Sequence, residues 1–159
     1  MDASQWATPD LQELVDLFYD SPEELGEFEE VEADQLPPNY RQLLAHHSHM
    51  TVTLEEFHRS MVDVMVIDSI TSNSHYSRTI VLHRKSDSRA VQYGIVRLHR
   101  SFLEDEVFEE IVEQREPLGR ILIRHNVLRQ VKLLSLWNVE LGLALKSALD
   151  RSELEICYG

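Results

Sequence analysis

The sequence predicts an α+β fold in which a central antiparallel sheet is packed by short helices. Residues 76–85 and 90–100 each alternate in the manner of a strand, and the small or polar residues 86–89 between them favour a tight reversal. Residues 9–19 and 104–114 instead show apolar side chains at helical spacing. With 159 residues, 43% of them hydrophobic, the chain has the length and composition of one domain with one core.

The first 40 residues are predicted to form an acidic, partly helical N-terminal arm. They hold twelve of the 28 acidic residues and no Lys or Arg. Thr8 followed by Pro9 is typical of a helix start, which predicts a short amphipathic helix over residues 9–19. The acid-rich residues 27–34 have few apolar partners, so we expect a solvated segment there, either a mobile stretch or a lid or partner-docking element.

Residues 41–159 are predicted to form the α+β domain itself. A short helix is expected over residues 39–46, and a capping-box pattern at Thr51 and Thr53 indicates the start of another helix. Residues 60–70 are rich in Val, Ile and Met and predict a buried strand, which precedes the hairpin of residues 76–100.

The last third of the chain predicts further short elements. Residues 104–114 form an amphipathic helix that should cover one face of the sheet. A new short element opens at Pro117, and residues 128–139 have the pattern of a strand. A final helix or turn is expected over residues 141–150, followed by an incomplete strand over residues 154–157.

Charge and composition exclude several classes of function. Residues 41–159 contain sixteen acidic and 15 basic residues, so their net charge is close to zero. No net basic surface is therefore available to bind nucleic acid. No apolar run is long enough to cross a bilayer and the N-terminus lacks a secretion signal, so we expect no membrane partner and a cytoplasmic location. Cys157 is the sole cysteine, which excludes an intrachain disulfide and favours a buried structural thiol over a nucleophile.

The eight histidines raise a metal hypothesis, above all His46, His47, His49 and His58. The spacing does not support it, because no His-Glu-x-x-His pattern occurs and the clustered pairs do not repeat four residues apart. Surface or hydrogen-bonding histidines are therefore predicted, with no metal and no organic cofactor.

Arg78 and Arg84 are the candidate anion-binding side chains. On the predicted strand they share one face with Ile80 and Leu82. A guanidinium beside apolar residues suits a bidentate grip on a carboxylate, and a plain structural ion pair is the alternative. The turn at residues 117–119 adds a helix start, whose free backbone N–H groups favour an anion.

Three segments, taken in order, resemble the chorismate pyruvate-lyase family, whose members split chorismate into 4-hydroxybenzoate and pyruvate. The segments are His49-Met50-Thr51, the arginine-bearing strand of residues 76–82, and Glu116-Pro117-Leu118-Gly119-Arg120. The resemblance covers about residues 43–159 and leaves out the acidic arm. It implies a chorismate lyase-like sheet packed by helices. It also implies that Arg78 is the catalytic, carboxylate-holding residue, and that Met50, Thr51, Leu118 and Gly119 bind the substrate.

The chain departs from the family at its C-terminal end. Family members continue into a further hairpin, which carries a glutamate that faces the hydroxyl end of the ligand, whereas this chain ends before that hairpin. The predicted function is therefore binding of chorismate or a related aromatic carboxylate, with cleavage of chorismate as the activity to test. The alternatives are a non-catalytic small-molecule sensor on the same scaffold and a protein-interaction domain. In the latter, a partner or a second copy of the chain pairs with an open sheet edge.

Overall fold

The computed structural model describes residues 10–127 and 130–159, and within these residues it contains two three-stranded antiparallel sheets and six α-helices. The α+β class is confirmed, although the strands divide between two sheets instead of forming one central sheet. One sheet has the order β2 (Val62–Thr71), β3 (His75–Arg84) and β4 (Ala90–His99). The other has the order β1 (Gly26–Val31), β5 (Leu136–Leu141) and β6 (Ile156–Tyr158).

The predicted hairpin is confirmed and forms the centre of the first sheet. Arg78 lies opposite Val96, and Ile80 lies opposite Gly94. In the turn, Ser88 adopts a positive φ of 59°. Because alternate residues point to opposite faces, Arg78, Ile80 and Leu82 share one face of β3, as predicted.

The strand predicted over residues 60–70 is confirmed as β2, but the prediction that it is buried is wrong. Val62 is the buried residue of this strand, while Met65, Ile67 and Ile70 are exposed. The reason is the covering of the two faces. Val62 belongs to the buried group under helix α3 (Met50–His58), and Val64 and Val66 pack against that group, whereas Met65, Ile67 and Ile70 are exposed and belong to none of the buried groups. A β-bulge between Val66 and Asp68 interrupts the pairing, which is a device that discourages edge-to-edge association. Pairing of two copies through an open sheet edge stays a prediction.

The partly helical acidic arm that the sequence predicts is not confirmed, because the segment holds one short helix and also a strand. A short helix, α1 (Leu11–Asp16), does form, and its N-cap is Asp10, which accepts a hydrogen bond from the Glu13 amide at 2.8 Å. The predicted start at Thr8 and Pro9 lies outside the described residues. Further along, residues 26–31 form strand β1, which pairs antiparallel with β5. The glutamates of β1 are exposed while Phe28 is half-buried against Trp137, so a strand tolerates this acid-rich sequence.

The predicted helices form close to their expected positions. They are α2 (Pro38–Leu44), α3 (Met50–His58), α4 (Asp105–Val112), α5 (Leu118–Arg124) and α6 (Leu143–Ala148). Short 3₁₀ turns lie at η2 (Pro22–Glu24), η3 (Ala33–Gln35) and η4 (Arg100–Phe102). The start predicted at Thr51 and Thr53 is wrong, because the N-cap of α3 is His49, and the Thr53 hydroxyl donates to the His49 carbonyl at 3.1 Å.

The strand predicted over residues 128–139 is shorter than expected. It begins only at Leu136, residues 130–135 have no regular secondary structure, and Leu128 lies outside the described residues. Near the C-terminal end, β6 pairs with β5 and places Cys157 opposite Val139. The incomplete strand predicted for residues 154–157 forms as β6, which begins two residues later and ends one residue later.

Three groups of buried side chains hold these elements together. Under α4 and α5, Tyr76 packs with Phe108, Ile111, Ile121 and their neighbours. The group under α3 consists of Leu54, Val62, Ile80 and Leu82. Between the second sheet, α1 and α6, the buried residues are Val15, Leu25, Val139, Leu141 and Leu145.

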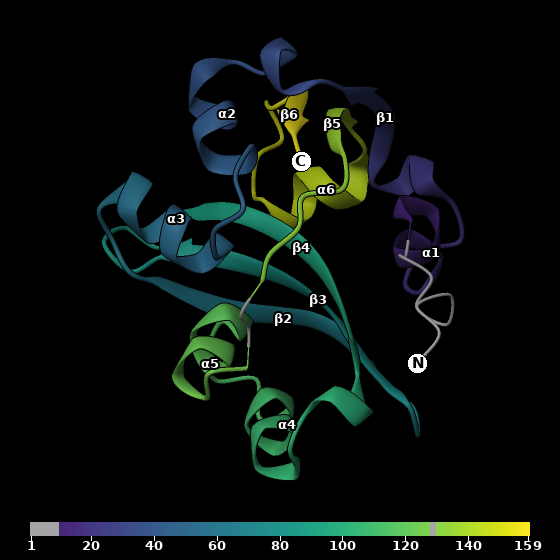
Figure 1. The fold of residues 1–159 in the computed structure, drawn as a ribbon. Coiled ribbons are helices and arrows are strands. Elements are labelled where there is room, and N and C mark those ends of the chain that lie inside the picture. Colours follow the sequence, from purple (N-terminus) through teal and green to yellow (C-terminus); the bar gives the residue numbers. More distant parts are fainter. Residues whose placement is uncertain (1–9, 128–129) are drawn as a thin grey trace.

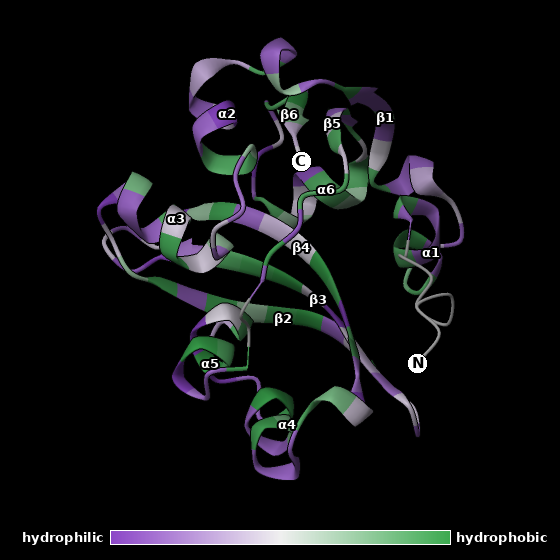
Figure 2. Cartoon of the chain, viewed as in Figure 1, coloured by the Kyte–Doolittle hydropathy of each residue, from purple (hydrophilic) through white to green (hydrophobic). Residues whose placement is uncertain are grey.

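Figure 1 shows the arrangement of the elements, with α4 and α5 side by side near the β2–β3–β4 sheet. In the same view the second sheet, α2 and α6 form a group beyond β4. Figure 2 shows hydrophobic residues alternating with hydrophilic ones along α4, as expected for a helix with one buried face. Within the described part of the chain, no helix combines the length and the apolar character needed to cross a bilayer.

Candidate functional site

Arg78 is the most deeply buried charged residue of the predicted site. Its exposure is 1%, and its Nη1 donates to the Ile111 carbonyl at 3.3 Å. The Nε atom of the same guanidinium is buried without a hydrogen-bond partner. None of the described carboxylates forms an ion pair with Arg78. Burial lowers the pKa of Arg78, while the Tyr76 hydroxyl opposes the shift through its charge interaction and hydrogen bond with the guanidinium.

The two chain segments that the sequence assigns to the same site do meet. Thr51, in the first turn of α3, is buried, and it lies against Gly119, in the first turn of α5. A Cβ atom built on Gly119 would lie 2.6 Å from Thr51 Oγ1, so glycine is what permits this close approach. The starts of α3 and α5 are therefore adjacent, although residues 51 and 119 are far apart in the sequence.

The remaining predicted residues divide between two parts of the interior. Leu118 packs against the buried group under α4 and α5, whereas Met50 packs against the group under α3. Among the described residues, Arg78 makes no hydrogen bond to Met50, Thr51, Leu118 or Gly119. The other candidate arginine, Arg84, is partly exposed and binds Asp87, which matches the structural ion pair that was the alternative for it.

A cavity of about 590 Å³ lies along β4, between α2, α3 and the C-terminal residues. Met50 lines it, whereas Arg78, Thr51, Leu118 and Gly119 do not. Most of the lining is apolar, with leucines from α1, α2, α3 and α6. None of the described residues that line it is Asp or Glu, although the chain has 28 acids, and its basic lining residues are His58, Arg84, Arg89 and Arg151.

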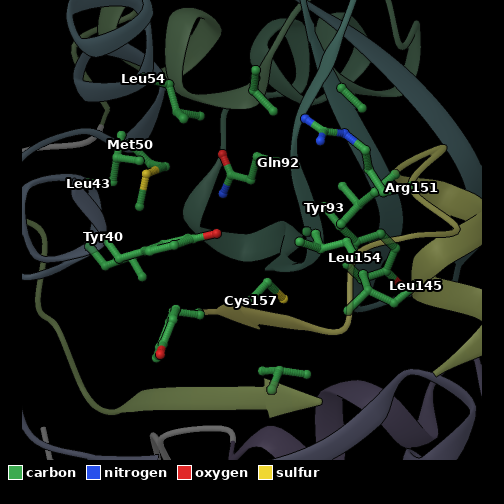
Figure 3. A pocket seen from close by; sticks show the side chains of 18 of the residues that line it. Tyr40, Leu43, Met50, Leu54, Gln92, Tyr93, Leu145, Arg151, Leu154 and Cys157 are labelled. Atoms are coloured by element: carbon green, nitrogen blue, oxygen red, sulfur yellow. The ribbon is translucent and has the colours of Figure 1, made fainter. Parts of the chain in front are cut away.

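A few polar groups converge inside this apolar cavity. Figure 3 shows the Gln92 carboxamide, the Tyr40 hydroxyl and the Arg151 guanidinium pointing toward its middle. The Oε1 atom of Gln92 is buried and has no hydrogen-bond partner. Burial raises the pKa of Tyr40, while the nearby Arg151 charge opposes the rise. An apolar cavity with a few convergent polar groups has the general character of a small-molecule site.

Two other titratable side chains in the cavity wall stay in their protonated forms near neutral pH. Burial raises the pKa of Cys157 to about 11, so it is a neutral thiol of low reactivity near neutral pH. Tyr93 shares a hydrogen bond of 2.8 Å with the Tyr19 hydroxyl, and burial together with this bond raises the pKa of Tyr93. Both side chains therefore contribute packing and hydrogen bonding without a charge.

Sequence reasoning missed Gln92, Tyr40 and Arg151. Gln92 carried one weak signal, because it is a polar residue between apolar neighbours near the start of a predicted strand. Tyr40 lay at the end of the segment assigned to the arm, and Arg151 followed a predicted helix or turn. Their proximity depends on the packing of α2 and the C-terminal residues against β4, which no local pattern reports.

Among residues 10–127 and 130–159, no group of three or more His, Cys, Asp or Glu side chains is arranged to hold a metal ion. Two of the clustered histidines make hydrogen bonds to the backbone, one local and one to a residue far away in the sequence. The Leu43 carbonyl lies 2.6 Å from Nε2 of His46, and the Leu133 amide donates to Nδ1 of His47 at 3.5 Å.

Comparison with known proteins does not identify a relative. The chain matches no protein-family model, no curated protein and no solved structure. The resemblance to the chorismate pyruvate-lyase family accordingly stays a prediction from the sequence.

Proposed function

We propose that the protein binds a small aromatic carboxylate of the chorismate or 4-hydroxybenzoate class, with Arg78 as the counter-ion of the ligand. One observation carries this proposal: the Arg78 guanidinium is 1% exposed and is paired with none of the described carboxylates. An ionised side chain removed from water without a counter-charge is strongly unfavourable. A ligand carboxylate would remove that penalty.

The hydrogen bonds of Arg78 leave at least its Nε donor without an acceptor, and a ligand would have to open space beside the guanidinium, because the cavity along β4 does not reach it. A guanidinium has five N–H donors, and one of those on Arg78 reaches the Ile111 carbonyl near the end of α4. The Nε donor has no acceptor. Because a carboxylate accepts two parallel N–H bonds from one edge of a guanidinium, a ligand carboxylate would satisfy Nε and a neighbouring nitrogen together.

The contact between Thr51 and Gly119 supports a site formed from the starts of α3 and α5, as the resemblance implies for Met50, Thr51, Leu118 and Gly119. In this proposal Arg78 holds the carboxylate, and Thr51, Leu118 and Gly119 enclose the rest of the ligand, whereas Met50 packs with the separate group under α3. Cleavage of chorismate, in which Arg78 would be the catalytic residue, is a separate activity that the same experiment measures.

The test is calorimetric titration of the purified protein with 4-hydroxybenzoate and with chorismate, alongside detection of released 4-hydroxybenzoate and pyruvate. We expect saturable binding, weakened at least about tenfold in Arg78→Met, because a hydrogen-bonded charge pair contributes about 1.5–3 kcal/mol. Arg115→Met removes an exposed arginine and is the matched control, for which binding should not change.

The binding and product-release measurements distinguish the proposal from its alternatives. Binding that survives Arg78→Met undiminished, or no binding of either compound, overturns the proposal. Binding with release of both products supports the lyase reading, whereas binding without release supports the non-catalytic sensor.

A further inference from the structure

The cavity along β4 is separate from the Arg78 position and calls for a different ligand. Its walls come from α2, α3, β4 and the C-terminal residues, and neither Arg78 nor Gly119 lines it. At about 590 Å³ it falls within the range of small-molecule sites, which is about 300–1,000 Å³. A compound with a single ring would leave much of this volume empty.

We propose that this cavity binds an amphipathic organic acid, whose carboxylate pairs with Arg151, whose neighbouring hydroxyl donates to Gln92, and whose apolar chain lies among the leucines. The three parts of this ligand follow from three features of the cavity. The first is the state of its basic residues, the second is the unpaired oxygen of Gln92, and the third is the apolar wall.

Arg151 is the basic residue best placed to meet an anion inside the cavity. Arg84 is already bound to Asp87, and Arg89 lies in the exposed turn between β3 and β4. The Arg151 side chain is 28% exposed, and its ion-pair partner, Glu153, is 70% exposed and 3.6 Å away. Such an exposed, long pair is weak, so Arg151 can exchange it for a ligand carboxylate at little cost. Figure 3 shows the Arg151 guanidinium directed into the cavity.

Gln92 supplies the second requirement. Its Oε1 atom is buried without a donor, and a buried polar atom with no partner is uncommon because it is unfavourable. In Figure 3 this oxygen lies on the Leu54 side of the carboxamide and the nitrogen on the Tyr40 side, so a rotation of the carboxamide would present the oxygen to a ligand hydroxyl close to the carboxylate. The adjacent Tyr40 hydroxyl can join the same network, since its raised pKa keeps it protonated.

The apolar part of the ligand is defined by the wall and by one glycine. Side chains of α2, α3, α6 and the C-terminal segment surround the polar groups in Figure 3, namely Leu43, Met50, Leu54, Leu145 and Leu154. Gly94 also lines the cavity, and a Cβ built on it meets only the Ile80 side chain at ordinary contact distances of 3.5 Å. The cavity therefore has room for a chain at Gly94, and a large side chain introduced there would occupy that room.

The test uses 3-hydroxydecanoate as the probe, with decanoate and methyl 3-hydroxydecanoate as matched comparisons, in calorimetric titrations of the full chain. We expect 3-hydroxydecanoate to bind most tightly. Loss of the charge in the methyl ester, or of the hydroxyl in decanoate, should weaken binding, and the loss of charge should weaken it about tenfold or more.

Substitutions of residues that line the cavity test which side chain contacts which part of the ligand. Arg151→Gln should weaken the acid about tenfold or more while leaving the ester unchanged. Gln92→Leu should remove the difference between 3-hydroxydecanoate and decanoate. Gly94→Leu should abolish binding of all three probes, while the exposed Arg115→Gln should change nothing. Circular dichroism and the thermal midpoint establish that each variant is folded.

A measurement on the unaltered chain tests the same site without relying on any variant. Cys157 lines the cavity, so saturating 3-hydroxydecanoate should slow its modification by a thiol reagent several-fold. No binding of 3-hydroxydecanoate, unchanged Cys157 reactivity, or equal affinity of acid and ester would each overturn the proposal. Arg78→Met should leave 3-hydroxydecanoate binding intact, which distinguishes failure at this cavity from failure of the proposed function.

Discussion

Thr51 and Gly119 lie so close together that a methyl group on Gly119 would fall 2.6 Å from Thr51 Oγ1. Gly119→Ala should therefore lower the free energy of unfolding by about 1–3 kcal/mol. Part of that loss is offset, because alanine favours a helix by about 1 kcal/mol over glycine. Urea unfolding measures the net change.

Two comparisons isolate this clash from a general effect of replacing glycine. Gly94→Ala places its Cβ at an ordinary 3.5 Å from Ile80 and should change stability by no more than about 0.5 kcal/mol. Adding Thr51→Ala to Gly119→Ala should restore part of the lost stability, because the opposing oxygen is gone. Additive effects of the two substitutions would show that the contact is not the cause.

Arg78→Met is expected to stabilise the ligand-free protein. The substitution keeps an unbranched apolar stem and removes a buried charge that no described carboxylate pairs with. It also removes the hydrogen bond to the Ile111 carbonyl, whose net contribution is about 1 kcal/mol. We expect relief of charge burial to exceed this loss and to raise the free energy of unfolding by about 1 kcal/mol or more.

The measurement is urea unfolding without ligand, beside Arg115→Met as the exposed control. Destabilisation by Arg78→Met would show that the arginine serves mainly to bind the end of α4. Stabilisation together with lost ligand binding is the combination expected of a residue kept for function.

Glu55 links α3 to β2 and α5, so its removal should lower the stability of the fold. Its carboxylate accepts from the Val62 amide at 3.0 Å and pairs with Arg120, which links α3 to β2 and to α5. Glu55→Ala leaves the Val62 N–H and the half-buried Arg120 without their acceptor, and should lower the free energy of unfolding by about 2–3 kcal/mol. Glu56→Ala, at an exposed position of the same helix, should change it by less than about 0.5 kcal/mol. Equal effects in the two variants would contradict this role.

His58 should make stability depend on pH in the acidic range. Arg84 Nη1 lies 3.4 Å from Nδ1 of His58, an arrangement that favours the neutral imidazole. Burial, and next the charge of Arg84, lower the pKa of His58. The unfolded chain therefore binds this proton more readily than the folded protein. The contribution of neutral His58 to the free energy of unfolding is fully present above the ordinary histidine pKa of about 6.5. It is lost as the pH falls through the lower pKa that His58 has in the folded protein.

Urea unfolding at about pH 7.5 and about pH 5.5 measures this dependence. The protein should lose stability between the two conditions, and His58→Gln should lose less. The exposed His47→Gln should retain the full dependence. If His58→Gln and His47→Gln respond alike, the acid sensitivity has another source.

Local patterns predict much of this fold because they depend on neighbouring residues alone. Alternation about a four-residue turn predicts the hairpin, and the helical spacing of Val107, Phe108 and Ile111 predicts α4, whose buried face those residues form. The same alternation places Arg78 on one face with Ile80 and Leu82. Its burial follows because α4 and α5 cover that part of the sheet.

Predictions fail where the outcome depends on a distant partner. Residues 26–31 contain three glutamates and have no strong strand pattern, yet they form β1 because β5 supplies the complementary backbone. Residues 60–70 have a strongly apolar pattern, yet most of β2 is exposed because the buried group under α3 reaches only Val62, Val64 and Val66. The candidate residues Met50 and Arg78 lie in different parts of the interior, and the cavity lined by Met50 includes three polar residues that no pattern singled out.

The sequence by itself therefore determined the α+β class, the hairpin, the helices and the side of β3 on which Arg78 lies, since each follows from the spacing of residues along one segment. The tertiary structure alone decided that Arg78 has no carboxylate partner among the described residues, that Thr51 meets Gly119, and that Tyr40, Gln92 and Arg151 share a cavity. The physical reason is that burial, pairing and cavity shape arise where segments far apart in the chain pack together, and spacing within one segment carries no information about that packing.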